Sequence, residues 1–219
     1  MKRLHRGVAP EVLTHYKHGQ HNWEDVTPTD KAAIRDAIRE MQCGLCAYCE
    51  GSLDALDQHV EHRCRKRRHP GRTFEWTNLF GSCDRKDSCG HFKDSGAAPH
   101  YECHVLLDPC VDDPDDYLII RQSGRVVPCP ALSDAARHRA QTTIDVLNLN
   151  LDHDHGGRSL CAERARRLQF YLQREPDLLG ALASFSVDEA EAIIVDEIAA
   201  TAHEPFSTII RHFLRGAPA

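Results

Sequence analysis

The side chains of this sequence best suited to chemistry are its thiols and imidazoles. Its 219 residues include ten cysteines and fifteen histidines, and seven of the cysteines lie between Cys43 and Cys103. A chain of this length can bury a core without disulfide bonds, and clustered cysteine and histidine indicate a metal site before a disulfide framework. We therefore expect free thiols and a bound metal ion in the first half of the chain.

Two pairs of cysteines have spacings that predict a structural zinc site. The four candidate ligands are Cys46, Cys49, Cys83 and Cys89. Four thiolates on two tight turns can surround Zn2+ tetrahedrally and close the long loop between the pairs. The second pair has a wider gap than usual, so Cys43 or Cys64 is an alternative ligand. Burial as small apolar side chains is the other role open to these cysteines.

A second set of residues lies inside this loop and just beyond it. Glu61 offers a hard oxygen ligand, and the neighbouring His62 is an imidazole that can accept a proton near pH 7. Residues 59–72 contain six Lys or Arg against one acid, which suits a phosphodiester held beside a divalent ion. A solvated loop is the alternative, and we expect His59 and His69 to be surface residues. The basic residues predicted to contact nucleic acid are Arg65, Lys66, Arg67, Arg68 and Lys93.

The order of these residues resembles the HNH endonuclease motif in its zinc-containing form. The matching positions are Cys46, Cys49, Glu50, Glu61, His62, Trp76, Asn78, Leu79, Cys83, Cys89, His91 and Lys93. Shorter stretches resemble one subgroup, the HNH subunit of Septu-type and retron-associated anti-phage systems. These stretches are Ala9 with Pro10, residues 106–116, the hairpin residues Gly124 and Pro128, and residues 143–150. The resemblance covers about residues 1–165, and residues 166–219 match no family pattern.

The resemblance implies a ββα-metal active site, with Glu61, His62 and Asn78 on two strands and His91 on a helix. In that arrangement His62 is the general base and Asn78 orients it through a hydrogen bond. Glu61 and His91 hold a catalytic Mg2+ or Mn2+. The sequence departs from the family pattern twice: the acid before the base is Glu where Asp is common, and Gly90 stands where the last ligand often follows the cysteine directly.

The subgroup also implies a partner, an ABC-type ATPase subunit that controls the nuclease, and a homo-oligomer within the larger complex is compatible with it. The expected function is hydrolysis of phosphodiester bonds in nucleic acid, with DNA favoured, by the nuclease effector of an anti-phage defence system. The alternative is a zinc-stapled nucleic-acid-binding or adaptor module without catalysis, which explains the cysteines and the basic residues equally well. Metal-dependent nicking of a plasmid, lost with EDTA, separates the two.

Charge is distributed unevenly along the chain. The formal net charge is −6, of which residues 1–100 carry +2 and residues 101–219 carry −8. An anionic ligand is therefore expected on the first half, and the acidic second half is expected to be a docking surface or a support. No apolar run reaches the ~18 residues that span a bilayer, and the first residues lack the apolar core of a signal peptide. We expect a cytoplasmic protein without membrane contact.

Local signals predict the elements that position these residues. Apolar residues at helical spacing predict a helix over 28–42, with Thr27 as N-cap and Asp30 as its capping-box partner. Residues 117–128 predict a β-hairpin. Later helical segments are expected from Ser133 or Asp134, over about 158–174, from a capping box at Ser186 to about 200, and after Pro205.

Together these elements predict an α+β fold that is mainly helical. It would combine a ββα-metal core stapled by the four-cysteine zinc site, a small β-hairpin and a C-terminal helical bundle. Four regions are expected: an N-terminal segment and helix (1–42), the zinc-containing HNH core (43–100), an acidic loop with the hairpin (101–132) and a C-terminal helical region (133–219).

Overall fold

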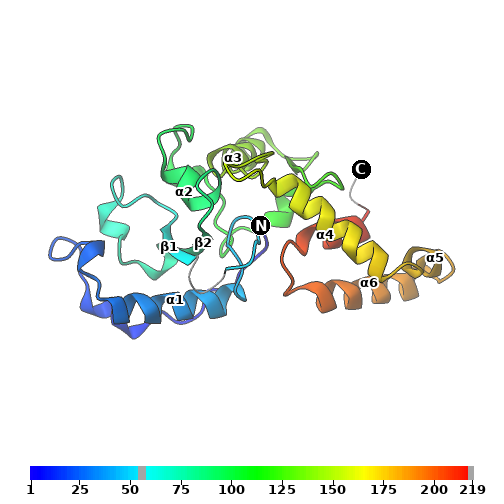
Figure 1. Ribbon diagram of the computed structural model, residues 1–219, viewed down its shortest axis with the longest axis horizontal. Coiled ribbons are helices and arrows are strands. Elements are labelled where there is room, and N and C mark those ends of the chain that lie inside the picture. Colours follow the sequence, from blue (N-terminus) through cyan, green and yellow to red (C-terminus); the bar gives the residue numbers. More distant parts are fainter. Residues whose placement is uncertain (54–57, 217–219) are drawn as a thin grey trace.

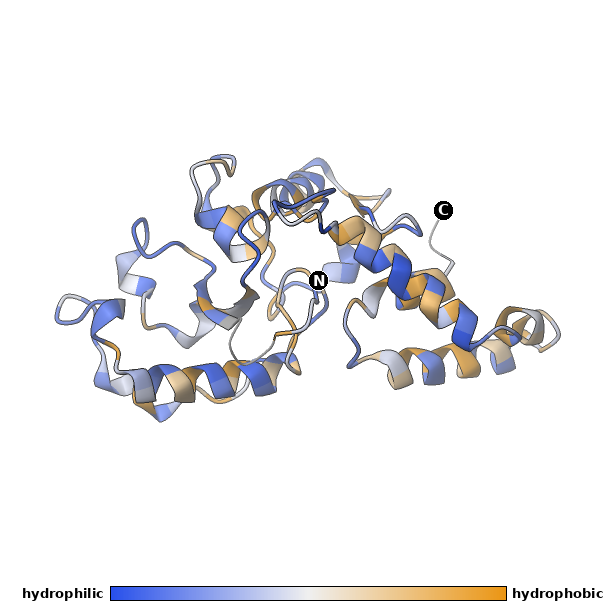
Figure 2. Ribbon diagram, viewed as in Figure 1, coloured by the Kyte–Doolittle hydropathy of each residue, from blue (hydrophilic) through white to orange (hydrophobic). Residues whose placement is uncertain are grey.

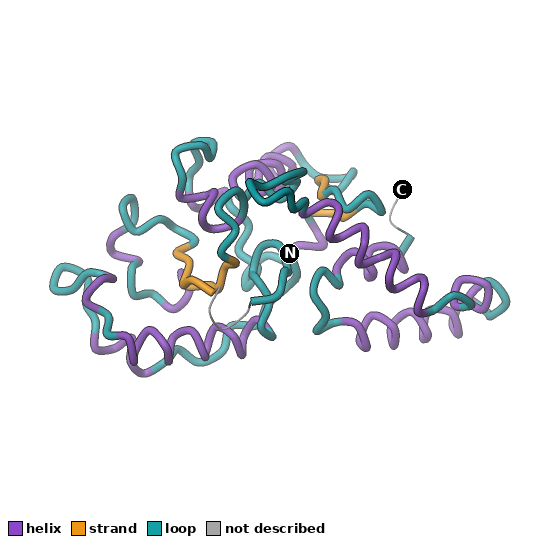
Figure 3. Tube along the Cα trace, viewed as in Figure 1, coloured by secondary structure: helices purple, strands orange, loops and turns teal. Residues whose placement is uncertain are grey.

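The computed structural model describes residues 1–53 and 58–216. Its fold is α+β with more helix than strand, as predicted (Figures 1 and 3). The helices and strands are α1 (Pro28–Gln42), β1 (Gln58–His62), β2 (Leu79–Cys83), α2 (Cys89–Asp94), β3 (Leu118–Ile120), β4 (Val126–Pro128), α3 (Asp134–Val146), α4 (Leu160–Arg174), α5 (Leu178–Leu182), α6 (Val187–Thr201) and α7 (Thr208–Leu214). Among the described residues, no helix combines the length and the apolar character needed to cross a bilayer.

β1 and β2 form an antiparallel pair, with Glu61 opposite Phe80, and α2 follows and packs against β2. Successive side chains of a strand point to opposite faces. His59 and Glu61 therefore share one face of β1, while Val60 and His62 share the other. This alternation decides which of the predicted site residues can meet.

α1 begins and ends where its sequence predicts, and the Thr27 side chain accepts a hydrogen bond from the Asp30 N–H. The second half of the predicted capping box is wrong. The Asp30 carboxylate accepts instead from the Tyr16 hydroxyl at 2.5 Å, and the Thr27 N–H donates to that same hydroxyl. Tyr16 thereby fastens the N-terminal segment to the start of α1.

The C-terminal elements also follow their local signals. The predicted hairpin is present as β3 and β4, and Ser133 and Ser186 cap α3 and α6, the latter through a complete capping box. α5 has no counterpart among the predicted elements, because it is only five residues long and contains Gly180, a poor helix former. Figure 2 shows polar and apolar residues alternating along α4 and α6, as expected of amphipathic helices.

One hydrophobic core runs through both halves of the chain. It includes Cys49 and Phe80 beside the strand pair, Leu147 after α3, and Tyr171 and Ile209 in the C-terminal helices. A smaller cluster joins α1 to the other face of the strand pair. The segment that carries the predicted site is thus held on one side by the main core and on the other by α1.

Candidate functional site

Four buried cysteines from three segments converge beside β2. Cys46 and Cys49 lie in the turn after α1, Cys83 ends β2, and Cys89 begins α2. Their sulfur atoms all lie within 4.8 Å of one another. Zinc–thiolate bonds of about 2.3 Å in a tetrahedron place sulfurs about 3.8 Å apart, and the Cys49 and Cys83 sulfurs are 3.8 Å apart. This group can hold a metal ion, and its members are the four ligands predicted from spacing.

The two alternative ligands lie elsewhere. Cys43 is exposed in a left-handed conformation at the end of α1. Cys64 forms a disulfide with Cys103, with the Cα atoms 5.2 Å apart, and this corrects the expectation that all cysteines are free thiols. The pair is separated by 39 residues in the sequence, and only the folded loop after β1 brings the two together.

The Glu61 carboxylate is buried between β1 and α2, beside the Lys93 ammonium and the His59 ring. Lys93 Nζ lies 2.8 Å from Oε1, and His59 Nε2 lies 3.3 Å from Oε2. Burial favours the protonated acid, but the charge of Lys93 and the hydrogen bond from His59 outweigh it and lower the pKa of Glu61. Glu61 is therefore an ionised oxygen donor at neutral pH. Lys93 itself is fully buried. Its ammonium therefore supports Glu61, and the prediction that Lys93 contacts flanking phosphates is wrong for this structure.

His91 reaches Glu61 through His59. The rings of His59 and His91 are 4.2 Å apart between centroids, and His91 Nε2 lies 2.8 Å from Asp84 Oδ1. His59, Asp84 and His91 each offer one ligand atom, and these three atoms lie within 4.8 Å of one another. Partial burial and the neighbouring His59 lower the pKa of His91, so a nitrogen lone pair is available near pH 7. His59 was expected to be a surface residue, yet it is the side chain that joins the two predicted ligands.

Gly90 permits this approach of α2 to β1. A Cβ atom at Gly90 would lie 2.7 Å from Glu61 Cδ and 2.9 Å from His59 Nε2. The space that a side chain would fill at this position is thus occupied by the Glu61 carboxylate and the His59 ring. The unusual glycine noted in the sequence is a consequence of this packing.

His62 lies on the other face of β1. Its Nε2–H donates to the Thr73 carbonyl oxygen at 3.0 Å, and its ring packs edge-on against Trp23, with centroids 4.6 Å apart. Burial lowers the pKa of His62 to about 4. A neutral ring that donates from Nε2 has its lone pair on Nδ1, which is the nitrogen that can accept a proton. The structure therefore supplies a neutral base, but on the face opposite Glu61.

Asn78 supports the loop that holds His62 and does not contact its ring. The fully buried amide accepts from the Cys64 N–H at 2.7 Å and donates to the carbonyl oxygens of Cys64 and Arg72. The prediction that Asn78 bonds the His62 ring is wrong, since Thr73 makes that bond. Arg72 directly precedes Thr73, so Asn78 positions His62 through the backbone of this loop.

The predicted basic residues differ in their availability. Arg65 pairs with Asp94 at 3.0 Å and Lys66 with Glu24 at 3.2 Å. Arg68 donates to the Tyr101 carbonyl oxygen and contacts His100, while Arg67 is exposed. These ion pairs involve partly exposed partners and contribute little to stability, so the basic side chains can exchange their partners for phosphate.

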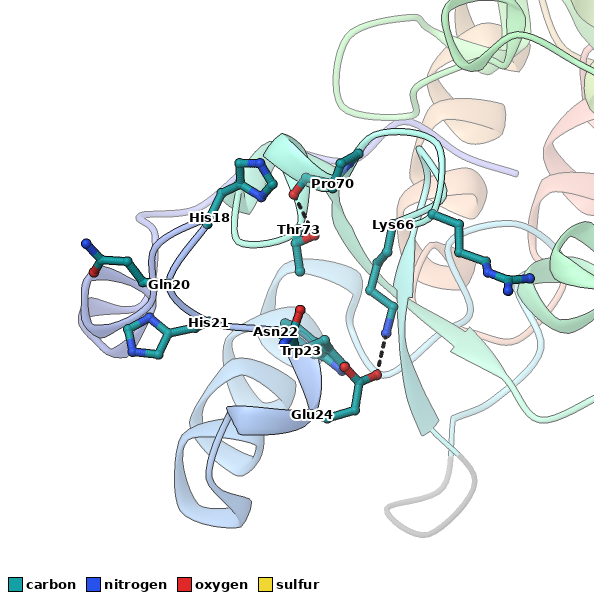
Figure 4. Close-up of a pocket in the computed structure, with 11 residues that line it drawn as sticks. His18, Gln20, His21, Asn22, Trp23, Glu24, Lys66, Pro70 and Thr73 are labelled. Carbon is teal, nitrogen blue, oxygen red and sulfur yellow. Dashed lines mark hydrogen bonds and ion pairs between the residues drawn. The ribbon is translucent and has the colours of Figure 1, made fainter.

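A cavity of about 390 Å³ lies beside His62, between the loop 18–24 and the segment 66–73. Trp23 and Thr73, which both contact the His62 ring, line this cavity. Figure 4 shows His18 and His21 on one side and Lys66 on the other, with Trp23 between them. Two signals in the sequence could have revealed these contributors: the alternation that puts His59 beside Glu61, and the large aromatic Trp23 in a polar segment.

The sequence is similar to two proteins described as HNH endonucleases of retrons and to one protein described as a Septu protein. No family model matches the chain. It is 25% identical over 150 residues to a protein of Vibrio cholerae serotype O1 biovar El Tor described as the HNH endonuclease of retron Vc95, covering 65% of this chain and 68% of that protein. It is 31% identical over 122 residues to the Septu protein PtuB of Bacillus thuringiensis, covering 55% of this chain and 42% of PtuB.

A third relative is described as the HNH endonuclease of retron Ec83 from Escherichia coli. It is 25% identical over 197 residues, covering 68% of this chain and 74% of the relative. The three similarities confirm the resemblance to HNH endonucleases of Septu and retron systems that the motif predicted.

Proposed function

We propose that this protein is a metal-dependent HNH endonuclease that hydrolyses phosphodiester bonds in nucleic acid, DNA before RNA, as the nuclease effector of an anti-phage defence system. An ABC-type ATPase subunit would control it, as the resemblance implies. The observation that carries the proposal is the order of two strands and a helix beside four buried cysteines, with Glu61, His59 and His91 gathered between β1 and α2. Three relatives named for Septu or retron defence support the same class.

The residues between β1 and α2 fit a divalent cation. His59, Asp84 and His91 offer two imidazoles and a carboxylate within 4.8 Å of one another, and Glu61 adds an ionised oxygen next to His59. His59 Nδ1 is a buried nitrogen without a hydrogen-bond partner among residues 1–53 and 58–216. Mg2+ or Mn2+ bound here would neutralise charge on the scissile phosphate and on the departing oxygen. His59 and Asp84 thus join Glu61 and His91 in the proposed ligand set.

The other side chains position the water and the substrate. His62 Nδ1 accepts the proton of the attacking water, while Thr73 fixes the ring through Nε2. Asn78 holds the loop that carries Thr73, and Lys93 keeps Glu61 ionised. Arg65, Lys66, Arg67 and Arg68 hold neighbouring phosphates.

Plasmid nicking tests the catalytic role of His62. With Mn2+ present, His62→Ala should lower the rate by ~10²–10⁴, the usual contribution of a general base. His69→Ala, a half-buried histidine of the same segment, is the control and should cut like the wild type. Cleavage that survives in His62→Ala would remove His62 from the base role.

The location of His62 on the face opposite Glu61 is the observation that favours the alternative, a zinc-stapled binding or adaptor module without catalysis. Wild-type protein that binds plasmid but never nicks it, with Mg2+ or Mn2+ and with its ATPase partner present, would establish that alternative. Nicking that stops on addition of EDTA would exclude it.

The four-cysteine group is proposed to hold a structural Zn2+. Cys46→Ser should abolish stoichiometric zinc in metal analysis and lower the thermal midpoint, because the ion joins the turn after α1 to β2 and α2. Cys43→Ser changes an exposed thiol three residues away and should keep both the zinc and the midpoint. Equal zinc contents in the two variants would contradict this ligand set.

A further inference from the structure

The cavity beside His62 has the composition of a nucleotide site. Trp23, half-buried with its ring stacked on Phe74, lines the cavity as its aromatic residue, and Lys66 and Arg67 supply positive charge against the single acid Glu24. His18 and His21 add ring nitrogens that can donate to phosphate. A volume of about 390 Å³ falls in the range that encloses small ligands, ~300–1,000 Å³.

In the free protein, the lysine of this cavity forms an ion pair with an exposed glutamate that a phosphate could replace. Lys66 Nζ lies 3.2 Å from Glu24 Oε1, and the Glu24 side chain is 76% exposed. The same ammonium lies 6.0 Å from the centroid of the Trp23 ring. A phosphate that takes the place of Glu24 on Lys66 would therefore lie near the Trp23 ring, which Figure 4 shows beside Glu24.

The cavity is also joined to the candidate base. Trp23 meets the His62 ring edge-on, and the Thr73 carbonyl that orients His62 belongs to a residue of the cavity wall. A base stacked on Trp23 must leave its partner strand, because a paired base presents only its edge in a groove. Stacking on an aromatic side chain beside positive charge is how proteins bind unpaired strands without reading their sequence.

We propose that this cavity binds an unpaired nucleotide of the substrate, with its base on Trp23 and its phosphate on Lys66, next to His62. The proposal rests on the proposed nuclease function and adds to it the substrate class, a single-stranded or locally opened strand.

Binding of fluorescein-labelled 12-mers tests the proposal, measured by anisotropy with the full chain and without added divalent ion. Trp23→Leu should weaken binding of oligo-dT or oligo-U by about tenfold or more, while Trp23→Phe should weaken it less. Phe170→Leu changes an exposed aromatic residue of α4 and should leave binding unchanged. Comparing oligo-dT with oligo-U tells whether the strand is DNA or RNA. A duplex of the same length should bind equally to wild type and Trp23→Leu.

A second variant tests the phosphate contact. Lys66→Gln removes one phosphate contact and should reduce the slope of log affinity against log salt concentration by about 1. Arg125→Gln, on the β3–β4 hairpin, should leave this slope unchanged. If Trp23→Leu does not fold, quenching of tryptophan fluorescence by oligo-dT tests whether a base stacks on Trp23. It is expected in the wild type and absent in Trp23→Phe, where the buried Trp76 is the only remaining tryptophan.

Unchanged single-strand affinity in folded Trp23→Leu, or an equal loss for duplex and single strand, would overturn the inference. Cleavage that persists with such a result would leave the nuclease function standing. Trp23-dependent binding by a protein that never cleaves would reject the nuclease function and keep the binding site.

Discussion

Glu61 and His62 are adjacent in β1 and both buried, yet they have different charges at neutral pH. Glu61 has the ammonium of Lys93 at 2.8 Å and stays ionised, whereas burial without a matching counter-charge keeps His62 neutral. A hydrolase that uses a cation and a base needs this division between an anionic ligand and a free lone pair. Strand alternation produces it, because each side chain enters a different environment.

The lowered pKa of His62 predicts a specific loss of stability in acid. Its folded-state pKa of about 4 lies below the ordinary value of ~6.5, so the unfolded chain takes up the proton first and stability falls as pH drops from 6.5 toward 4. Between pH 7 and pH 5 this group should cost about 2 kcal/mol in the free energy of unfolding. Urea denaturation at both pH values should show this difference in the wild type and its absence in His62→Asn. His69→Asn should behave like the wild type, and an unaltered pH dependence in His62→Asn would refute the assignment.

At the scale of the elements, α2 and β1 meet through a residue without a side chain. Gly90→Ala would push Cβ against the Glu61 carboxyl group and the His59 ring, which Lys93 and the core hold in place. The expected cost is ~1–3 kcal/mol in the free energy of unfolding, as for other overpacked cores, with loss of nicking. Gly96→Ala, two residues after α2, meets no atom within 4 Å and is the matched control. Similar unfolding free energies for the two variants would show that α2 can move away freely.

The sequence predicts most elements because their ends carry local chemistry. Thr27, Ser133 and Ser186 are N-caps, and each stands in the sequence as a hydroxyl residue just before a stretch of apolar residues at helical spacing. The four-cysteine group was also predictable, since spacing alone limits which thiols can share an ion. The contacts of His62 and Asn78 were not, because they depend on how the loop 63–73 folds back over β1. The Cys64–Cys103 disulfide depends on the same loop.

At the scale of the whole molecule, the halves differ in charge but share one core. Two carboxylates of the predicted acidic loop are paired locally: Asp112 pairs with Arg139, and Asp115 pairs with Arg211 of α7. Arg85, two residues after β2, pairs with Glu163 of α4 at 2.6 Å. The Arg85–Glu163 pair joins the segment that carries the candidate site to α4, which therefore supports that segment directly.

A shared core predicts a single cooperative unfolding transition. Both tryptophans, Trp23 and Trp76, lie in the first half, whereas far-UV circular dichroism reports mainly α3–α7, so the two probes observe different halves. Their thermal midpoints should coincide. Leu147→Ala, in the core between the halves, should lower both midpoints together, with ~2–5 kcal/mol lost. Leu179→Ala, on the exposed side of α5, should change neither. Two separated transitions, or a shift of one probe alone in Leu147→Ala, would mean that the halves fold as independent domains joined only at their surfaces.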